Sequence, residues 1–181
     1  MRAPIENKYL DEESYKTCVT NLTLKYLDIL VIVKTKGCQD KFLLGKRNEN
    51  LAKGMFWLAG GRSKQFIEYN QRASELVAED FGVSLKSSNL IPIGYARLLW
   101  TTGAFTDKNG SRINADSDVS LFSVEIAPET VFKTGQCFSD VKLFDEDDAC
   151  KQNEYVNYAI DCYNYHKRHG TPNPWLKEID F

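Results

Sequence analysis

The chain has 181 residues, of which 43% are hydrophobic and 27% are charged, and this is typical of one globular domain with a sizeable core. Its net charge of −2 and pI near 5.8 argue against a nucleic-acid-binding surface, which normally needs clustered positive charge. No apolar run reaches the roughly 18 residues of a membrane span, and the N-terminus lacks the pattern of a signal peptide. We therefore expect a cytoplasmic protein.

The cysteines and histidines point the same way. Five cysteines are scattered along the chain without a Cys-X-X-Cys pair, which is typical of reduced thiols in a cytoplasmic protein. The two histidines, His166 and His169, both lie near the C-terminus, so we expect no zinc site.

The first third of the chain predicts one helix and three strands. An acidic start predicts a short N-terminal helix at 10–22, and the β-branched run at 24–34 predicts a strand that is buried apart from Asp28. A turn then leads to a return strand at 41–47. After a loop that ends at Gly54, a second short strand is expected in MFWLAGG.

The middle of the chain predicts a helix, two strands and a loop between them. Apolar residues at helical spacing predict a helix at 67–82, followed by a strand at 91–102. The polar, glycine-bearing segment 102–118 is expected to be a flexible loop that borders the substrate, and 119–126 alternates like a strand.

A short strand and a helix cap are expected at 141–148, then a C-terminal helix at 152–169, with basic residues in its last turn and Gly170 after it. The last residues form a tail that Trp175 could order. The order of these elements predicts a single α/β (α+β) domain over 1–181, with a mixed β-sheet between helices.

The most informative segment is the loop–helix–loop at 60–83. A glycine pair opens it, Gly82 closes it, and the adjacent carboxylates Glu79 and Asp80 stand near its end. Glycines permit the tight turn and close backbone approach that a phosphate site needs. A helix places carboxylates on one face, where they can hold a hard cation. This pattern suits divalent-metal diphosphate chemistry.

Together with FLLGKRNENLAKGMFWLAGG just upstream, this segment resembles a Nudix box. From about Leu10 to Tyr165 the chain resembles the GDP-mannose mannosyl hydrolase branch of the Nudix superfamily, through the strand around Asp28, LLGKR, FWLAGGR, EDFGV and NEYVNYAIDCY. The resemblance implies the Nudix α/β/α sandwich and a Mg²⁺- or Mn²⁺-dependent hydrolase that releases sugar and nucleoside diphosphate from a nucleotide sugar. It also implies a homodimer and a role in surface-polysaccharide biosynthesis.

The box departs from the general pattern at several positions. Counting from Gly61 to Gly82 gives the correct length, but Ile67 stands at the first Glu position and Glu75-Leu76 at the Arg-Glu pair. Leucine at the second position of that pair is a feature of the mannosyl hydrolase branch. Two other departures are not features of that branch: Glu75 in place of arginine and Asp80 in place of the last glutamate.

Three residues carry the expected substrate contacts. A buried charge such as Asp28 needs a partner, which is either a structural Lys or Arg or, as the resemblance implies, the nucleotide. The resemblance assigns Arg47 to the diphosphate and gives Arg62 the catalytic task of stabilising charge on the departing nucleoside diphosphate. Arginine's planar fork suits both tasks.

The resemblance places the metal at a backbone carbonyl of the glycine pair, represented by Gly61, and at the carboxylates Glu79 and Asp80. The alternative is that both carboxylates are solvated helix residues. The branch also uses a Gln-His pair before a late strand, to hold metal and to act as general base. One register puts Cys137 and Phe138 at those positions, and a shift of one puts Gln136 at the metal.

Neither register supplies a histidine, and loss of a general base costs about a hundred- to ten-thousand-fold in rate. Asp140 is the candidate for a weaker base, with Ser139 nearby. The branch's other site histidine and a site tyrosine fall near Leu98 and Val119. With Phe138, these residues would make the pocket more apolar, suiting a deoxy or acylated sugar.

Three functions remain open on the sequence. The first is the nucleotide-sugar hydrolase. The second is a Nudix-fold binding or regulatory protein without turnover, which the absent histidines and the altered Arg-Glu pair favour. The third is P–O cleavage of a nucleoside diphosphate compound with Glu79.

Overall fold

The computed structural model describes residues 14, 17, 23–48, 52–64, 66–106 and 112–181. The helix expected at 10–22 lies outside the described residues, apart from Ser14 and Thr17, which are both helical. Among the described residues, no helix combines the length and apolarity that crossing a membrane requires.

A mixed eight-stranded sheet forms the centre of the described structure. Its strand order is β3-β2-β1-β6-β5-β8, with β4 paired to β1 and β7 paired to β2. The strands are β1 (Leu24–Val33), β2 (Lys41–Arg47), β3 (Phe56–Trp57), β4 (Ala59–Arg62), β5 (Ile91–Thr106), β6 (Arg112–Ile126), β7 (Phe138–Phe144) and β8 (Leu176–Asp180).

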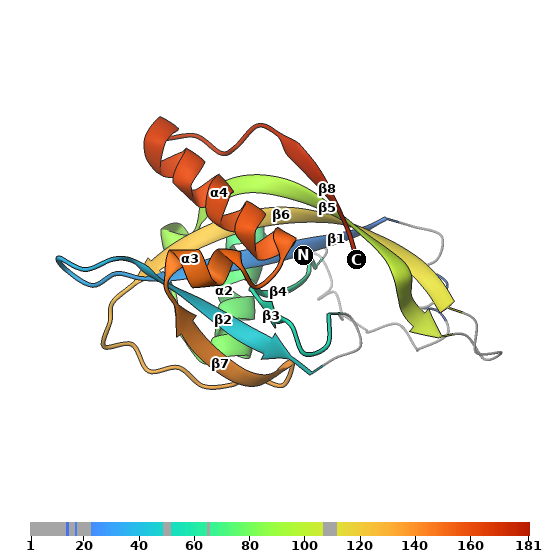
Figure 1. Cartoon of the computed structure of the whole chain (residues 1–181), viewed down its shortest axis with the longest axis horizontal. Coiled ribbons are helices and arrows are strands. Elements are labelled where there is room, and N and C mark those ends of the chain that lie inside the picture. The colour runs from blue at the N-terminus through green and yellow to red at the C-terminus, as the bar shows by residue number, and fades with distance from the viewer. Residues whose placement is uncertain (1–13, 15–16, 18–22, 49–51, 65, 107–111) are drawn as a thin grey trace, which may run out of the picture.

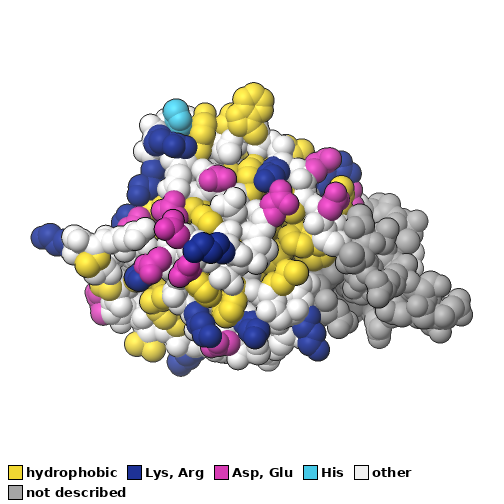
Figure 2. Space-filling view, in the orientation of Figure 1, with side chains coloured by type: hydrophobic (Ala, Val, Ile, Leu, Met, Phe, Trp, Pro, Cys, Tyr) yellow, Lys and Arg dark blue, Asp and Glu magenta, His cyan; other side chains and the backbone are white. Residues whose placement is uncertain are grey.

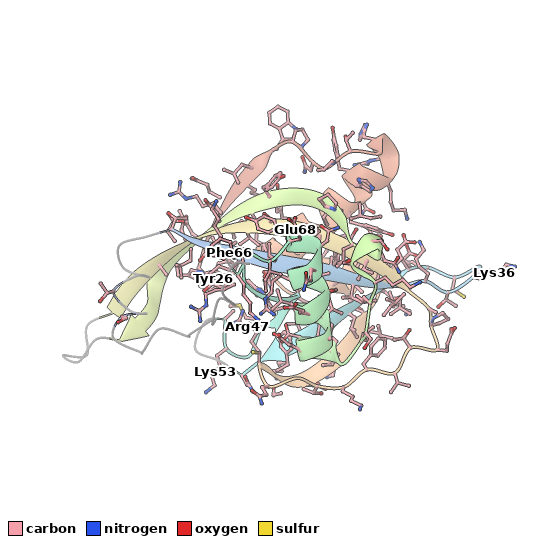
Figure 3. The ribbon with its side chains drawn as sticks, turned by 180° about the vertical axis from the view of Figure 1, so that it is seen from behind. Tyr26, Lys36, Arg47, Lys53, Phe66 and Glu68 are labelled. Carbon is pink, nitrogen blue, oxygen red and sulfur yellow. The ribbon has the colours of Figure 1, made fainter. Side chains whose placement is uncertain are left out.

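Helices cover both faces of this sheet. The helical elements are α2 (Tyr69–Phe81), the 3₁₀ turn η1 (Ser87–Asn89), α3 (Glu146–Cys150) and α4 (Glu154–His169). Figure 1 shows α4 in front of the sheet and α2 behind it, and Figure 3 shows the same order from the opposite side. The expected α/β/α sandwich with a mixed sheet is therefore confirmed.

The central strand β1 changes partners halfway along its length, and this positions the site. On one side it pairs in parallel with β6 along its whole length. On the other side its first half pairs with β4, and its last three residues pair with β2. The apolar run Ile29–Val33 is buried, as the β-branched pattern predicts. Asp28 lies in the half that pairs with β4.

Two expectations about the second half of the chain are wrong. Most of the segment expected as a loop, 102–118, is strand: β5 runs to Thr106 and β6 begins at Arg112. The expected tail contains β8, which pairs in parallel with β5. The Trp175 side chain is 74% exposed, and it is the Trp175 carbonyl that is held, by the Tyr158 hydroxyl at 2.6 Å. Backbone hydrogen bonding forms the β5–β6 extension and β8. The sequence of these segments shows little of the apolar alternation by which strands are recognised.

The ends of the helices tie them to the sheet. The Asn153 side chain accepts a hydrogen bond from the Val156 N–H, which caps α4, and donates one to the Phe56 carbonyl at 2.9 Å. Helix α2 begins at Tyr69, two residues later than expected, because Glu68 is extended.

Figure 2 shows charged side chains of both signs interspersed on the face that α4 covers.

The loop before β7 holds the C-terminal end of α2. The N–H groups of Gly135 and Lys133 donate to the carbonyls of Asp80 and Phe81 at 2.8 and 2.9 Å. A Cβ on Gly135 would lie 2.3 Å from the Glu79 carbonyl oxygen. This approach of two backbones fixes the end of the helix that carries Asp80.

We predict that Gly135→Ala lowers the free energy of unfolding by about 1–3 kcal/mol, because the added methyl group meets backbone that cannot rotate away. Chemical denaturation monitored by circular dichroism measures this. Thr134→Ala, at the exposed neighbouring position, is the matched control and should leave stability within about 0.5 kcal/mol. Equal stability of the two variants would show that the loop does not hold α2.

Candidate functional site

Asp28 is a buried carboxylate, 5% exposed, held by two neutral donors. The Tyr155 hydroxyl of α4 donates to Oδ2 at 2.7 Å, and the Trp57 indole N–H of β3 donates to the same atom at 3.3 Å. Burial raises the pKa of Asp28 to about 6, although the Tyr155 hydrogen bond and the charge of Arg47 act in the opposite direction. Asp28 is thus oriented by neutral groups and costly to ionise.

Asp80, in the last turn of α2, is the second buried carboxylate of the site and is 4% exposed. Its Oδ2 accepts the Gly60 backbone N–H at 2.9 Å. Burial, together with the negative charges of Asp28 and Glu79, raises the pKa of Asp80 to about 7, although the Gly60 hydrogen bond and the charge of Arg47 act in the opposite direction. Strand β4, which lies in the MFWLAGG segment, thus supplies the Gly60 N–H that binds Asp80 of α2.

Gly60 holds the two carboxylates together. It pairs with Asp28 across β1 and β4, and a Cβ added to it would lie 1.9 Å from the Asp28 Oδ1 and 2.9 Å from the Leu27 carbonyl oxygen. Only glycine leaves room for the Asp28 side chain while its own N–H reaches Asp80. The sequence predicts a role for Gly61 only, although Gly60 belongs to the same glycine pair.

Two arginines come from the strands that pair with β1. The Arg47 guanidinium, at the end of β2, lies 5.8 Å from the centroid of the Trp57 ring, and its charge lowers the pKa of both Asp28 and Asp80. Arg62 follows Gly60 by two residues in β4, so its side chain leaves the same face of the strand as the Asp28 side chain. Figure 3 shows Arg47 between α2 and the segment that carries Lys53.

Glu79 is engaged by Arg72, a residue that the sequence analysis missed. The two carboxylate oxygens of Glu79 accept from the Arg72 guanidinium at 2.8 and 3.2 Å. The same guanidinium bonds Glu75 at 3.2 Å, and its Nε donates to the Arg62 carbonyl at 3.3 Å. Spacings of three and seven residues put these side chains on one helix face, a pattern that was legible in the sequence.

The residues present do not fit the divalent cation that the resemblance implies. Glu79 is neutralised by Arg72, and Asp80 is buried with a raised pKa and a backbone donor. Gln136 is exposed, and its carbonyl accepts from Asn48. Within the described ranges, no cluster of three or more His, Cys, Asp or Glu side chains is arranged to hold a metal.

Asp140 lies on the face of the sheet opposite α2, the helix that carries Asp80. Asp140 pairs with Lys46 of β2, whereas Phe138 pairs with the next residue, Arg47. Consecutive strand residues point to opposite faces, so Asp140 and Phe138 do as well. The Phe138 ring stacks on Phe81 of α2, and Asp140 therefore points away from α2.

The surroundings of Asp140 and of the expected pocket residues agree with this placement. Asp140 forms an ion pair with Lys142 at 3.2 Å.

Leu98, Val119 and Phe138 are all buried in the hydrophobic core. The sequence analysis expected these three residues to make a sugar pocket apolar, but the structure uses them for packing.

Comparison with solved structures decides the fold. The Nudix domain of Shewanella oneidensis NrtR, complexed with ADP-ribose, superposes with a TM-score of 0.59 at 16% identity, over 88% of this chain and 99% of that one. The Ap4A hydrolase of C. elegans gives 0.58 at 12% identity, over 82% and 98%. A MutT/nudix family protein of Enterococcus faecalis gives 0.53 at 14% identity, over 76% of this chain and 57% of that protein.

The chain has the Nudix fold. No protein-family model and no curated protein matches the sequence. The low identity to the solved structures means that the Nudix likeness lies in the arrangement of strands and helices. The GDP-mannose branch is therefore taken up below as a proposal.

We predict that Asp28→Asn stabilises the protein at pH 8 by about 1–3 kcal/mol, because asparagine still accepts both hydrogen bonds without a buried charge. The native pKa of about 6 lies above the ordinary value of 3.8, so the stabilising contribution of protonation is complete at low pH and is lost as pH rises through 6. The gap between variant and wild type should open between pH 4 and pH 7. Denaturation at each pH measures it, and a constant gap would contradict the assignment.

Proposed function

We propose that this chain binds a nucleotide sugar at Asp28, Arg47 and Arg62, as a Nudix-fold binding or regulatory protein whose hydrolytic activity is weakened or lost. The observation that carries the proposal is the buried Asp28 carboxylate next to Arg47. A charge held in the core at a cost to stability is typical of a functional site.

The chemistry of these residues matches the two ends of a nucleotide sugar. Guanidinium groups bind diphosphate oxygens in bidentate fashion, and Arg47 and Arg62 supply two of them. Asp28, oriented by Tyr155 and Trp57, is an acceptor for a ribose hydroxyl or a base N–H. The ADP-ribose bound to the Nudix domain of NrtR is a compound of this class.

Binding is favoured over turnover because the expected catalytic groups are not assembled. Asp140 points away from α2 and is paired with Lys142, and Gln136 is exposed. The histidines His166 and His169 lie in the last turn of α4, far along the chain from the Nudix helix. The general base expected from the sequence, Asp140, is therefore not on the face of the sheet that α2 covers.

Hydrolysis is the second candidate, and Asp80 is the observation in its favour. A carboxyl group with a pKa of about 7 can accept a proton from water near neutral pH. In the mannosyl hydrolase reaction, water attacks the anomeric carbon, the sugar–oxygen bond breaks, and Arg62 stabilises the nucleoside diphosphate that leaves. Cleavage within the diphosphate would instead give a sugar phosphate and a nucleoside monophosphate.

The resemblance supplies the more specific parts of the proposal. It favours a GDP-mannose-like ligand, a homodimer and a place in polysaccharide biosynthesis, and these three points remain predictions.

We predict that GDP-mannose or ADP-ribose binds the wild-type protein in a calorimetric titration, and that Arg47→Gln weakens binding about tenfold or more, because a charge-assisted hydrogen bond is lost. Arg97→Gln is the matched control, since Arg97 pairs with Asp116 elsewhere on the sheet. Equal affinity of all three proteins, or no binding of any nucleotide sugar tested, would contradict the proposed function.

Product analysis of the same mixtures separates the two candidates. Binding without product supports the binding protein. Free sugar with nucleoside diphosphate, or sugar phosphate with nucleoside monophosphate, would each establish an enzyme, and an Asp80→Asn variant that abolishes the product would identify the base.

A further inference from the structure

Arg72 occupies the part of the site where the resemblance places a metal. Its guanidinium contacts both oxygens of Glu79 and the carbonyl of Arg62, the residue that directly follows the glycine pair. Its terminal nitrogen lies 3.9 Å from the position of a Cβ on Gly61. A carboxylate of the box helix and a backbone carbonyl near the glycine pair are the kinds of ligand that a divalent cation would take here.

The Arg72 side chain is built into the fold. It is only 6% exposed, and besides Glu79 it bonds Glu75, which also lies 3.8 Å from the Lys64 ammonium group. Arginine stays protonated at any pH that proteins tolerate. Moving this guanidinium away would leave a buried charge without its partners, which is strongly destabilising.

Electrostatic repulsion opposes the simultaneous binding of a divalent cation and the Arg72 guanidinium at Glu79. Two unit charges 4 Å apart interact by about 4 kcal/mol near a protein surface, and a divalent ion doubles the repulsion. The guanidinium also neutralises Glu79, whose charge would otherwise repel a diphosphate bound at Arg47 and Arg62. One buried residue thus performs two tasks of a metal: it fills the cation position and cancels the carboxylate charge.

We infer that Arg72 is the built-in cation of this Nudix site, so that the protein binds a diphosphate ligand without a divalent metal. The ligand part of this inference rests on the proposed function, whereas the cation part concerns Arg72 and its carboxylates alone. The two parts are tested separately.

The first test uses Mn²⁺ alone, with free Mn²⁺ measured by electron paramagnetic resonance during titration of the full-length protein. We expect wild type to bind no Mn²⁺ tighter than about 1 mM, and Arg72→Gln to bind it at least about tenfold tighter, because Glu75 and Glu79 become available. Arg97→Gln, which releases Asp116 in the same way, should gain no site. Arg72→Lys, which keeps the charge, should gain none either.

The second test uses ADP-ribose as the ligand, titrated with EDTA or with Mg²⁺ present. The wild-type protein should bind ADP-ribose with equal affinity in EDTA and in Mg²⁺. Arg72→Gln should lose affinity about tenfold in EDTA and regain it with Mg²⁺, because the metal then replaces the missing charge. A merely structural role of Arg72 would weaken binding in both conditions alike and would overturn the inference.

Two further outcomes would overturn it. The first is stoichiometric, micromolar Mn²⁺ binding by wild type. The second is a folded Arg72→Gln variant that gains no Mn²⁺ affinity. If Arg72→Gln does not fold, the wild-type Mn²⁺ titration alone decides. If ADP-ribose does not bind wild type in either condition, the proposed function fails for this ligand, while the Mn²⁺ titrations still decide the role of Arg72.

Discussion

The described site depends on Gly60, which stands between two buried carboxylates. Its missing side chain makes room for Asp28, and its N–H donates to Asp80 at 2.9 Å. Strand β4 can place Gly60 against both Asp28 and Asp80 because β1 changes partners. The first half of β1 pairs with β4, and its last residues pair with β2. The partner change in β1 therefore determines where the carboxylates of β1 and α2 meet.

The resulting electrostatic arrangement is unusual for a site expected to hold metal. Asp28 and Asp80 are both desolvated by burial, and the charge of Asp28 also acts on Asp80, so the pKa of each lies above its ordinary value. Arg47 faces this pair, and Arg72 neutralises Glu79 beside it. Negative charge is thus balanced by arginines and by protonation, and the protein keeps a charge distribution that suits an anionic ligand.

The sequence predicts the fold well where hydrophobic patterning decides it. The β-branched run of β1, the return strand β2 and the amphipathic helix α2 lie within a few residues of their expected bounds. Patterning fails for the β5–β6 extension and for β8, where backbone pairing forms the strands and the sequence shows little apolar alternation. Strand register and edge pairing depend on tertiary contacts that no local pattern records.

Prediction of the site follows the same division. Asp28, Arg47, Arg62 and Asp80 come from segments with a recognisable order, and the charge of Arg47 acts on both Asp28 and Asp80. Asp140 occupies the face opposite α2, because an irregularity in the pairing of β2 with β7 determines which face it occupies. The partners of Asp28 could not be predicted, because Tyr155 lies 127 residues away along the chain. Arg72 could have been predicted, since its spacing from Glu75 and Glu79 defines one helix face.

The most direct measurement is a crystal structure of the protein grown with ADP-ribose and Mn²⁺, with the anomalous scattering of manganese recorded. We expect the diphosphate against Arg47 and Arg62, with Arg72 still bonded to Glu79 and no anomalous peak between Glu79 and Asp80. A manganese peak at those two carboxylates, with Arg72 displaced, would contradict the central claim and would restore a metal-dependent Nudix site.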